Sequence, residues 1–207
     1  MRTLGKILGI AAIIVLVLAV VLVSFGAWTV HRPFPQLNGE ITVAGLEGSV
    51  EVVRDDLGIP QIYADSIDDL FFAEGYVHAQ DRFYEMDVRR HITAGRLSEM
   101  FGDSQVETDK VIRTMGWRRV AEQEYEMLSA QTRQILEAYA RGVNAYVADR
   151  SGPELSLEYS VLRLINSEYS IEPWDPVDSV AWLKALAWDL GGNMGDEIQR
   201  SLAAAAV

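Results

Sequence analysis

The sequence predicts an α+β chain that is mainly helical, with a β-hairpin near its N-terminus and, before the hairpin, one membrane-spanning or signal helix in an N-terminal segment of residues 1–30. Three observations lead to this prediction. An uninterrupted apolar run lies near the N-terminus, β-branched residues concentrate soon after it, and most of the remaining sequence carries apolar residues at helical spacing. The 207 residues are enough for about one domain of ordinary size.

The apolar run over residues 7–30 contains no charged residue. A helix of about 20 apolar residues can cross a bilayer because it satisfies its own backbone hydrogen bonds. A cleaved signal peptide has a shorter core of roughly 7–15 apolar residues and a small-x-small cleavage site, for which residues 24–26 (SFG) are a passable match. The length of the run favours a retained anchor, and both alternatives send residues 31–207 across the membrane. Because Arg2 and Lys6 precede the run, we expect a cytoplasmic N-terminus and an extracytoplasmic remainder, secreted if the segment is cleaved.

The segment after the apolar run is strongly acidic. Residues 1–30 hold two basic residues and no acidic residue, so 16 of the 18 basic and all 30 acidic residues follow, a net charge of −14. This charge repels polyanions and no basic run is present, so nucleic acid is excluded as a partner. The absence of cysteine excludes disulfides, thiolate metal sites and a cysteine nucleophile within this chain.

The first elements after the apolar run are a linker and a hairpin. Residues 31–39 (HRPFPQLNG) are predicted as a linker because their two prolines prevent the helix from continuing. A β-hairpin is predicted over residues 41–53, from ITVAGL and SVEVV, with Glu47-Gly48 as its turn. RDDLGIP is then predicted as a separate turn, followed by the short strand QIYA.

A long helix is predicted from Ser66 to Gly95, with the Ser66 hydroxyl and the Asp69 carboxylate capping free backbone donors. An apolar stripe follows at spacings of four, three, four and three: Phe72, Tyr76, Ala79, Phe83 and Met86. Further helices are predicted over residues 97–101, 109–128 and 131–148. A last helix opens at Asp178, after the rigid turn PWDP, and ends near Gly191-Gly192.

The face opposite that stripe carries Glu74, His78, Asp81, Glu85 and Arg89 at helical spacing. Carboxylates and histidines so arranged can bind transition metals, but such a site also needs ligands from another helix. A polar face with local ion pairs such as Glu85–Arg89 is the favoured interpretation.

The sequence contains no self-sufficient catalytic set. It has no G-x-S-x-G elbow, S-x-x-K, H-E-x-x-H or nucleotide-binding glycine loop. In AWDLGGNMGDEIQR, residues 187–200, Asn193, Asp196 and Glu197 cluster after two glycines. Oxygen ligands on such a segment suit calcium, although acidic residues after a helix are commonly caps.

Four motifs, taken in their order, resemble the N-terminal, α-subunit part of the penicillin acylase family, a branch of the N-terminal-nucleophile hydrolases. They are VEVVRDDLGIPQIYADSIDDLFFAEGYVHAQDRFYEMDVRRHITAGRLSEMFG, ILEAYARGVNAYV, EPWDP and WDLGGNMGDEI, and they lie within residues 41–198. The resemblance implies that residues 40–207 are an incomplete α-subunit region of an αββα architecture.

The resemblance also implies an activity, the hydrolysis of acyl-amide bonds in β-lactam side chains, acyl-homoserine lactones or similar compounds. A precursor would be processed into two subunits, and the serine that begins the second subunit would be the nucleophile, with its own α-amine as base. That serine is not in this sequence. No catalytic residue is therefore expected in this chain, which alone should be inactive.

Site residues follow from the resemblance as well. Glu197 matches a carboxylate that binds a structural calcium ion shared with the second subunit, and no organic cofactor is implied. One wall of the acyl pocket is expected near residues 188–194, with Trp188, Asn193 and Met194 as substrate-binding residues. This segment lacks the aromatic and arginine pattern of phenylacetyl-selective members, so phenylacetyl preference is not expected. The alternative is a membrane-anchored, non-catalytic acidic helical module that binds a partner.

Overall fold

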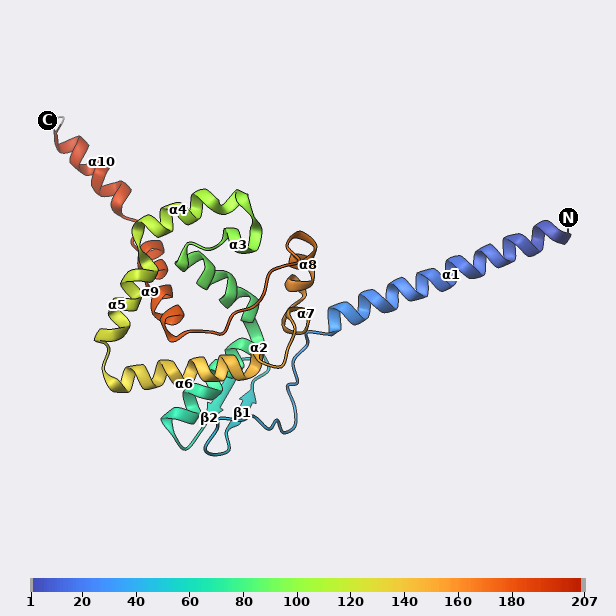
Figure 1. Cartoon of the computed structure of the whole chain (residues 1–207), viewed down its shortest axis with the longest axis horizontal. Coiled ribbons are helices and arrows are strands. Elements are labelled where there is room, and N and C mark those ends of the chain that lie inside the picture. Colours follow the sequence, from blue (N-terminus) through green and yellow to red (C-terminus); the bar gives the residue numbers. More distant parts are fainter. Residues whose placement is uncertain (1, 206–207) are drawn as a thin grey trace.

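The computed structural model describes residues 2–205 and is mainly helical with one small sheet, as predicted (Figure 1). Met1, in the predicted 1–30 segment, and residues 206–207, in the predicted 40–207 region, lie outside the described residues. The elements in order are α1 (Arg2–His31), β1 (Glu51–Arg54), β2 (Pro60–Tyr63), α2 (Ile67–Ala94), α3 (Ser98–Phe101), a 3₁₀ turn η1 (Asp103–Gln105), α4 (Val106–Met115), α5 (Trp117–Met127), α6 (Ala130–Val147), α7 (Gly152–Leu155), α8 (Leu157–Ile165), α9 (Pro176–Leu190) and α10 (Met194–Ala205).

The sheet is an antiparallel hairpin of β1 and β2, so the predicted hairpin over residues 41–53 is wrong. The predicted strand over residues 41–46 is irregular, and β1 pairs instead across RDDLGIP. Asp55 explains this turn, because its Oδ1 accepts hydrogen bonds from the backbone of Leu57 (2.9 Å) and Ile59 (2.8 Å). Gly58 completes the turn with a φ of 79°, which glycine adopts without steric penalty.

The predicted turn at Glu47-Gly48 has a different role. The backbone N–H groups of these two residues donate to the Asp69 carboxylate, at 2.8 and 3.1 Å. The predicted cap by Ser66 is confirmed, since its side chain accepts from the Asp69 N–H at 3.0 Å. The prediction that the Asp69 carboxylate caps α2 is wrong. This carboxylate holds the preceding loop against α2, and the hydrogen bond from Glu47 lowers the pKa of Asp69.

The core forms where α2 crosses α6. The two backbones approach closely at Gly75 and Gly142, where an added Cβ would lie 2.1 Å from the Tyr139 carbonyl oxygen and 1.8 Å from that of Phe72. The predicted stripe of α2 faces this core, with Phe72, Ala79, Phe83 and Met86 buried and Tyr76 partly buried. A smaller apolar cluster joins α5 to the start of α9: Ala121, Val177, Val180 and Ala181.

Most of the predicted helices are confirmed, and one is wrong. The end of α2 at Gly95 agrees with its left-handed conformation, and the bounds of α3, α6 and α9 match within a few residues. The helix predicted over residues 109–128 is two helices, because Gly116 takes a φ of 74° between α4 and α5. Helices α7, α8 and α10 were not predicted from the sequence.

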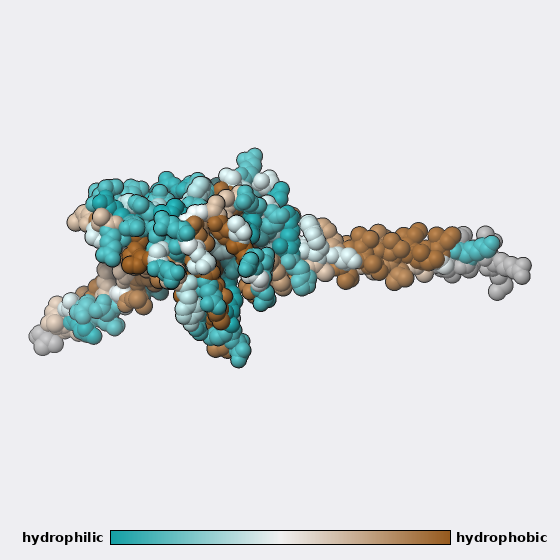
Figure 2. Space-filling view, turned by 90° about the horizontal axis from the view of Figure 1, so that it is seen from below, coloured by the Kyte–Doolittle hydropathy of each residue, from teal (hydrophilic) through white to brown (hydrophobic). Residues whose placement is uncertain are grey.

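The predicted N-terminal segment is a helix that projects from the body (Figures 1 and 2). Within residues 9–31 of α1, an 18-residue window has a mean hydropathy of 3.0, and the helix is long and apolar enough to cross a membrane. A signal sequence near the N-terminus can meet the same criteria of length and composition, so the helix is compatible with both sequence-based alternatives.

Candidate functional site

The four residues predicted to bind substrate or metal lie together where α9 ends and α10 begins. Trp188 is in the last turn of α9, Asn193 is in the turn that follows, and Met194 and Glu197 are in the first turn of α10. All four side chains are exposed, at 60% for Trp188 and 64% for Met194. The structure therefore gathers the predicted residues in one segment, which does not enclose a pocket by itself.

Trp188 and Met194 belong to a longer set of exposed apolar residues on α9 and α10, which we call the α9–α10 strip. Its members are Leu183, Leu186, Trp188, Leu190, Met194, Ile198 and Leu202. Trp188 touches the body through Trp117 of α5, with ring centroids 6.3 Å apart, whereas α10 projects away from the body (Figure 1). Large exposed apolar surfaces mark interaction sites.

The start of α9 is fixed firmly to the body. Asp175 accepts a hydrogen bond from the Val177 N–H at 2.8 Å, and its own N–H donates to Asp178 at 2.9 Å, which forms a capping box. Asn144 of α6 donates to the Trp174 carbonyl at 2.9 Å and accepts from the Trp174 N–H at 2.7 Å. These bonds set the direction in which α9 leaves the body.

Asp178 joins this cap to two arginines. It forms an ion pair with Arg118 of α5, and Arg90 Nη1 of α2 lies 4.0 Å from its other oxygen. Burial raises the pKa of Asp178, while the Asp175 N–H and both arginines oppose that shift. The carboxylate thus ties α9 to two other helices at once.

A buried hydrogen-bonded network centred on Asp87 lies next to the start of α9 and supports it. Asp87 Oδ1 accepts from Arg90 Nε at 2.7 Å, and its Oδ2 accepts from the hydroxyls of Tyr159 at 2.5 Å and Tyr169 at 2.6 Å. Burial alone would raise the pKa of Asp87, but interactions with His91, Arg90 and the two tyrosines outweigh burial and lower it. The charged carboxylate is therefore stable inside the fold.

Arg90 extends this network to the segment before α9. Its guanidinium donates to the carbonyl oxygens of Glu172 and Pro173, both at 2.9 Å, and its side chain is 5% exposed. Within the part of the chain that the structure describes, no buried side-chain nitrogen or oxygen lacks a hydrogen-bond partner. The network is thus complete, which is the condition for buried charge to rigidify a fold.

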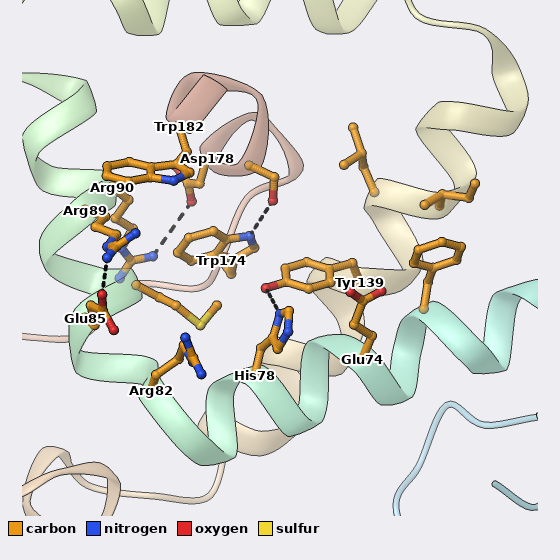
Figure 3. Close-up of a pocket in the computed structure, with 15 residues that line it drawn as sticks. Glu74, His78, Arg82, Glu85, Arg89, Arg90, Tyr139, Trp174, Asp178 and Trp182 are labelled. Carbon is orange, nitrogen blue, oxygen red and sulfur yellow. Dashed lines mark hydrogen bonds and ion pairs between the residues drawn. The ribbon is translucent and has the colours of Figure 1, made fainter. Parts of the chain in front are cut away.

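The polar face of α2 lines an open pocket of about 410 Å³ between α2, α6 and α9 (Figure 3). In it, His78 Nδ1 lies 3.0 Å from the Tyr139 hydroxyl. Burial raises the pKa of Tyr139, so the phenol stays protonated and can donate to a neutral His78. Glu85 and Arg89 form the predicted ion pair, and Arg89 lies over the Trp182 ring at 4.5 Å.

The structure argues against the helical metal site. His78 pairs with Tyr139, whereas Asp81 turns to Arg54 of β1, 2.7 Å away. Among residues 2–205, no group of three or more histidine, aspartate or glutamate residues is placed to hold a metal ion. The polar-face interpretation therefore stands, with the addition that this face borders a pocket.

Comparison with known proteins identifies the family. The family model described as penicillin amidase matches residues 49–207. This chain belongs to the penicillin amidase family. It is 37% identical over 169 residues to penicillin acylase 2 proenzyme of Pseudomonas sp. strain SE83, covering 82% of this chain and 21% of that protein. It is 34% identical over 193 residues to acyl-homoserine lactone acylase QuiP of Pseudomonas fluorescens strain Pf0-1, covering 92% and 22%.

A solved structure of thermostable penicillin G acylase from Alcaligenes faecalis matches with a TM-score of 0.60 and 30% identity. The match covers 77% of this chain and 91% of that chain. In contrast, the chain spans about a fifth of the length of the curated relatives it matches.

The charged motif of α2 also has a buried half that was not predicted from the sequence. Asp87, Arg90 and His91 are 0%, 5% and 2% exposed, although the motif was interpreted through its outer face. A signal was present, because Arg90 falls four residues after Met86 and so continues the apolar stripe. A charged residue at a core position indicates a paired, buried network.

Proposed function

We propose that this chain is one part of an acyl-amide hydrolase whose nucleophile is supplied by a second polypeptide. The observation that carries the proposal is the α9–α10 strip, an exposed apolar surface that includes two of the three predicted substrate-binding residues, Trp188 and Met194. An extended exposed apolar surface is stabilised when a partner covers it. Family membership supports the reaction class, since the relatives are named as penicillin and acyl-homoserine lactone acylases.

The lengths of the relatives support a second polypeptide. The matched part of this chain covers 91% of one chain of the Alcaligenes faecalis acylase but about a fifth of the curated relatives' sequences, one of which is named a proenzyme. A region equivalent to this chain therefore exists as a chain of its own in a relative. The chemistry then belongs to the partner, whose N-terminal serine attacks the amide carbon while its α-amine accepts the hydroxyl proton.

In this proposal the chain binds the acyl group and leaves the bond-breaking groups to the partner. Trp188 and Met194 supply apolar surface for the acyl chain, and the Asn193 amide supplies a donor and an acceptor. Since an acyl contact acts on ground state and transition state alike, its loss should raise KM more than it lowers kcat.

Glu197 fits the role of one calcium ligand. Its carboxylate is exposed in the first turn of α10 and pairs with Arg200 at 2.7 Å. Calcium takes six to eight oxygen ligands, so a single carboxylate here would need further oxygens from the second polypeptide. Bound there, the ion would hold α10 against the partner; it takes no part in the proposed attack.

The test of activity uses protein expressed from the complete gene. Purified protein is incubated with penicillin G and with acyl-homoserine lactones of short and long acyl chain, and amine release is followed by mass spectrometry. We expect amide cleavage, and Trp188→Ala should raise KM. Leu57→Ala, which changes an 84% exposed side chain in the β1–β2 turn, is the matched control and should leave KM unchanged. Folded protein that cleaves no acyl amide would refute the proposal and favour the non-catalytic binding module.

The calcium ligand is tested with a closely matched pair of variants. Glu107 also lies in the first turn of a helix and pairs with a cation three residues later, Lys110, at 2.6 Å. Calcium should raise the Tm of the wild type and of Glu107→Gln, and a chelator should reverse this effect, because a ligand that binds only the folded state stabilises it. Glu197→Gln should lose the response. An unchanged response in Glu197→Gln would show that calcium binds elsewhere.

A further inference from the structure

Helix α8 has two apolar faces, and among the residues that the structure describes only one of them packs against the rest of the fold. Tyr159 and Leu162 point into the core and are each 2% exposed. Val161, Leu164 and Ile165 lie on the outer side and are 54%, 86% and 69% exposed. A surface helix normally places polar residues on its outer face, so this helix carries an apolar face that packing within the chain does not explain.

The position of α8 is defined by a clamp at the end of α1. Arg32 directly follows α1, and its Nη2 lies 3.2 Å from both Ser151 Oγ and Glu154 Oε1. Glu154 belongs to α7, and α8 begins at Leu157, three residues later. Figure 1 shows α7 and α8 at the end of the body from which α1 departs.

The linker after the clamp is also held on the body. The Gln36 carbonyl accepts a hydrogen bond from Gln80 Nε2 of α2 at 2.9 Å. A tether that docks at two points on the body sets which side of the body faces α1. It does not behave as the flexible linker that a free leader segment would have.

The end of α1 marks where a membrane surface would lie. Phe25 and Trp28 are in its last two turns, with ring centroids 5.9 Å apart, and Arg32 lies over the Trp28 ring at 5.1 Å. Aromatic residues at the end of a spanning helix sit at the level of the lipid headgroups. The clamp thus brings the α7–α8 segment within reach of that level.

We propose that the outer face of α8 rests on the lipid surface of the membrane that α1 spans, so the chain contacts the bilayer at two places. An interfacial helix buries aliphatic side chains among the headgroups, as Val161, Leu164 and Ile165 would do. The clamp makes this contact intramolecular, which favours lipid over a freely diffusing partner. The body carries a strong negative charge, so the contact is apolar and should form on zwitterionic lipid and be insensitive to salt. This contact requires that α1 is retained as a membrane anchor, and it does not depend on the proposed catalysis.

The chain lends itself to a site-specific test because it contains no cysteine. Val161→Cys is labelled with an environment-sensitive dye, and the full chain, with any polypeptide that co-purifies, is reconstituted into phosphatidylcholine vesicles containing headgroup-proximal spin-labelled lipid. Val111→Cys on α4 is the matched control, since Val111 is 57% exposed and Val161 is 54% exposed. Leu164→Cys is a second labelling site if the first variant does not fold.

We expect blue-shifted emission and several-fold stronger quenching at residue 161 than at residue 111, with no change in high salt. Adding Leu164→Glu should abolish the difference, because a charged side chain in the centre of the face opposes burial among apolar groups. Equal quenching at residues 161 and 111 would overturn the inference. Blue-shifted emission at residue 161 without quenching by the spin-labelled lipid would also overturn it, by showing that a protein and not lipid covers α8. Amide hydrolysis, measured on the same samples, separates this outcome from failure of the proposed function.

Discussion

Gly142→Ala tests the close crossing of α2 and α6. The added Cβ would lie 1.8 Å from the Phe72 carbonyl oxygen, whereas non-bonded heavy atoms prefer about 3.5 Å. The atom it meets belongs to the backbone of α2, so no side-chain rotation relieves the clash and the helices must separate by more than about 1 Å. That separation loosens the core around Phe72, Val143 and Tyr146.

The magnitude follows from two opposing terms. Overpacking in a core costs about 1–3 kcal/mol, and a backbone clash belongs at the upper end of that range. Alanine gains about 1 kcal/mol over glycine in helix propensity. The free energy of unfolding should therefore fall by about 2 kcal/mol, which shifts the urea midpoint down by about 1 M for an m-value of about 2 kcal/mol/M.

The assay is urea unfolding of the full chain in non-ionic detergent, followed by tryptophan fluorescence. Gly195→Ala in α10 is the matched control, because its Cβ would have no neighbour within 4 Å, so only the propensity gain remains. Gly75→Ala, on the other side of the crossing, should behave like Gly142→Ala. A midpoint for Gly142→Ala equal to that of Gly195→Ala would refute the close approach.

Two further predictions concern carboxylates. Asp87→Asn removes the charge that compensates buried Arg90 and should lower the free energy of unfolding by about 3 kcal/mol. Asp81→Asn, at a more exposed ion pair, should lower it by about 1 kcal/mol or less. Equal urea midpoints for the two variants would contradict this prediction. Hydrogen bonds from Ser151 and the charge of Arg32 lower the pKa of Glu154 from 4.5 to about 2, so its stabilising contribution is complete above pH 4.5 and disappears as the pH falls toward 2. Unfolding measured across that window should depend less on pH in Glu154→Gln, and an unchanged slope would contradict the clamp.

The elements that the sequence predicted well have strong local signals. Helix α2 begins after the side-chain cap of Ser66 and ends at Gly95, which has a left-handed conformation, and both signals are local. The hairpin failed for a non-local reason. The segment before Glu47 is rich in β-branched residues, but its loop is held by Asp69, 22 residues downstream of Glu47, and the strand pairing is decided by the Asp55–Gly58 turn. Propensity is a weak guide when tertiary contacts decide the partner.

The candidate site was predictable as a set of residues and not as a geometry. The resemblance placed Trp188, Asn193, Met194 and Glu197 in one stretch, and the structure gathers them at one helix junction. Their exposure could not be read from spacing, because a helical stripe has the same residue pattern whether it faces a core or another polypeptide. The structure also leaves their roles in binding substrate and metal as predictions.

The charged motif of α2 has an exposed pair and a buried pair with different roles. Helical geometry sends Glu85 and Arg89 outward to a pocket rim, and it sends Asp87 and Arg90 inward. The inward pair does not approach the α9–α10 strip. It fixes the carbonyl groups before α9, and α9 is a continuous helix from that point to Trp188. A small rotation at the start of a rigid helix produces a larger displacement at its end. The inward pair therefore affects the proposed acyl site by fixing the position of Trp188 at the end of α9. The Asp87→Asn variant should therefore raise KM for acyl substrates as well as lower stability, although Asp87 touches no substrate.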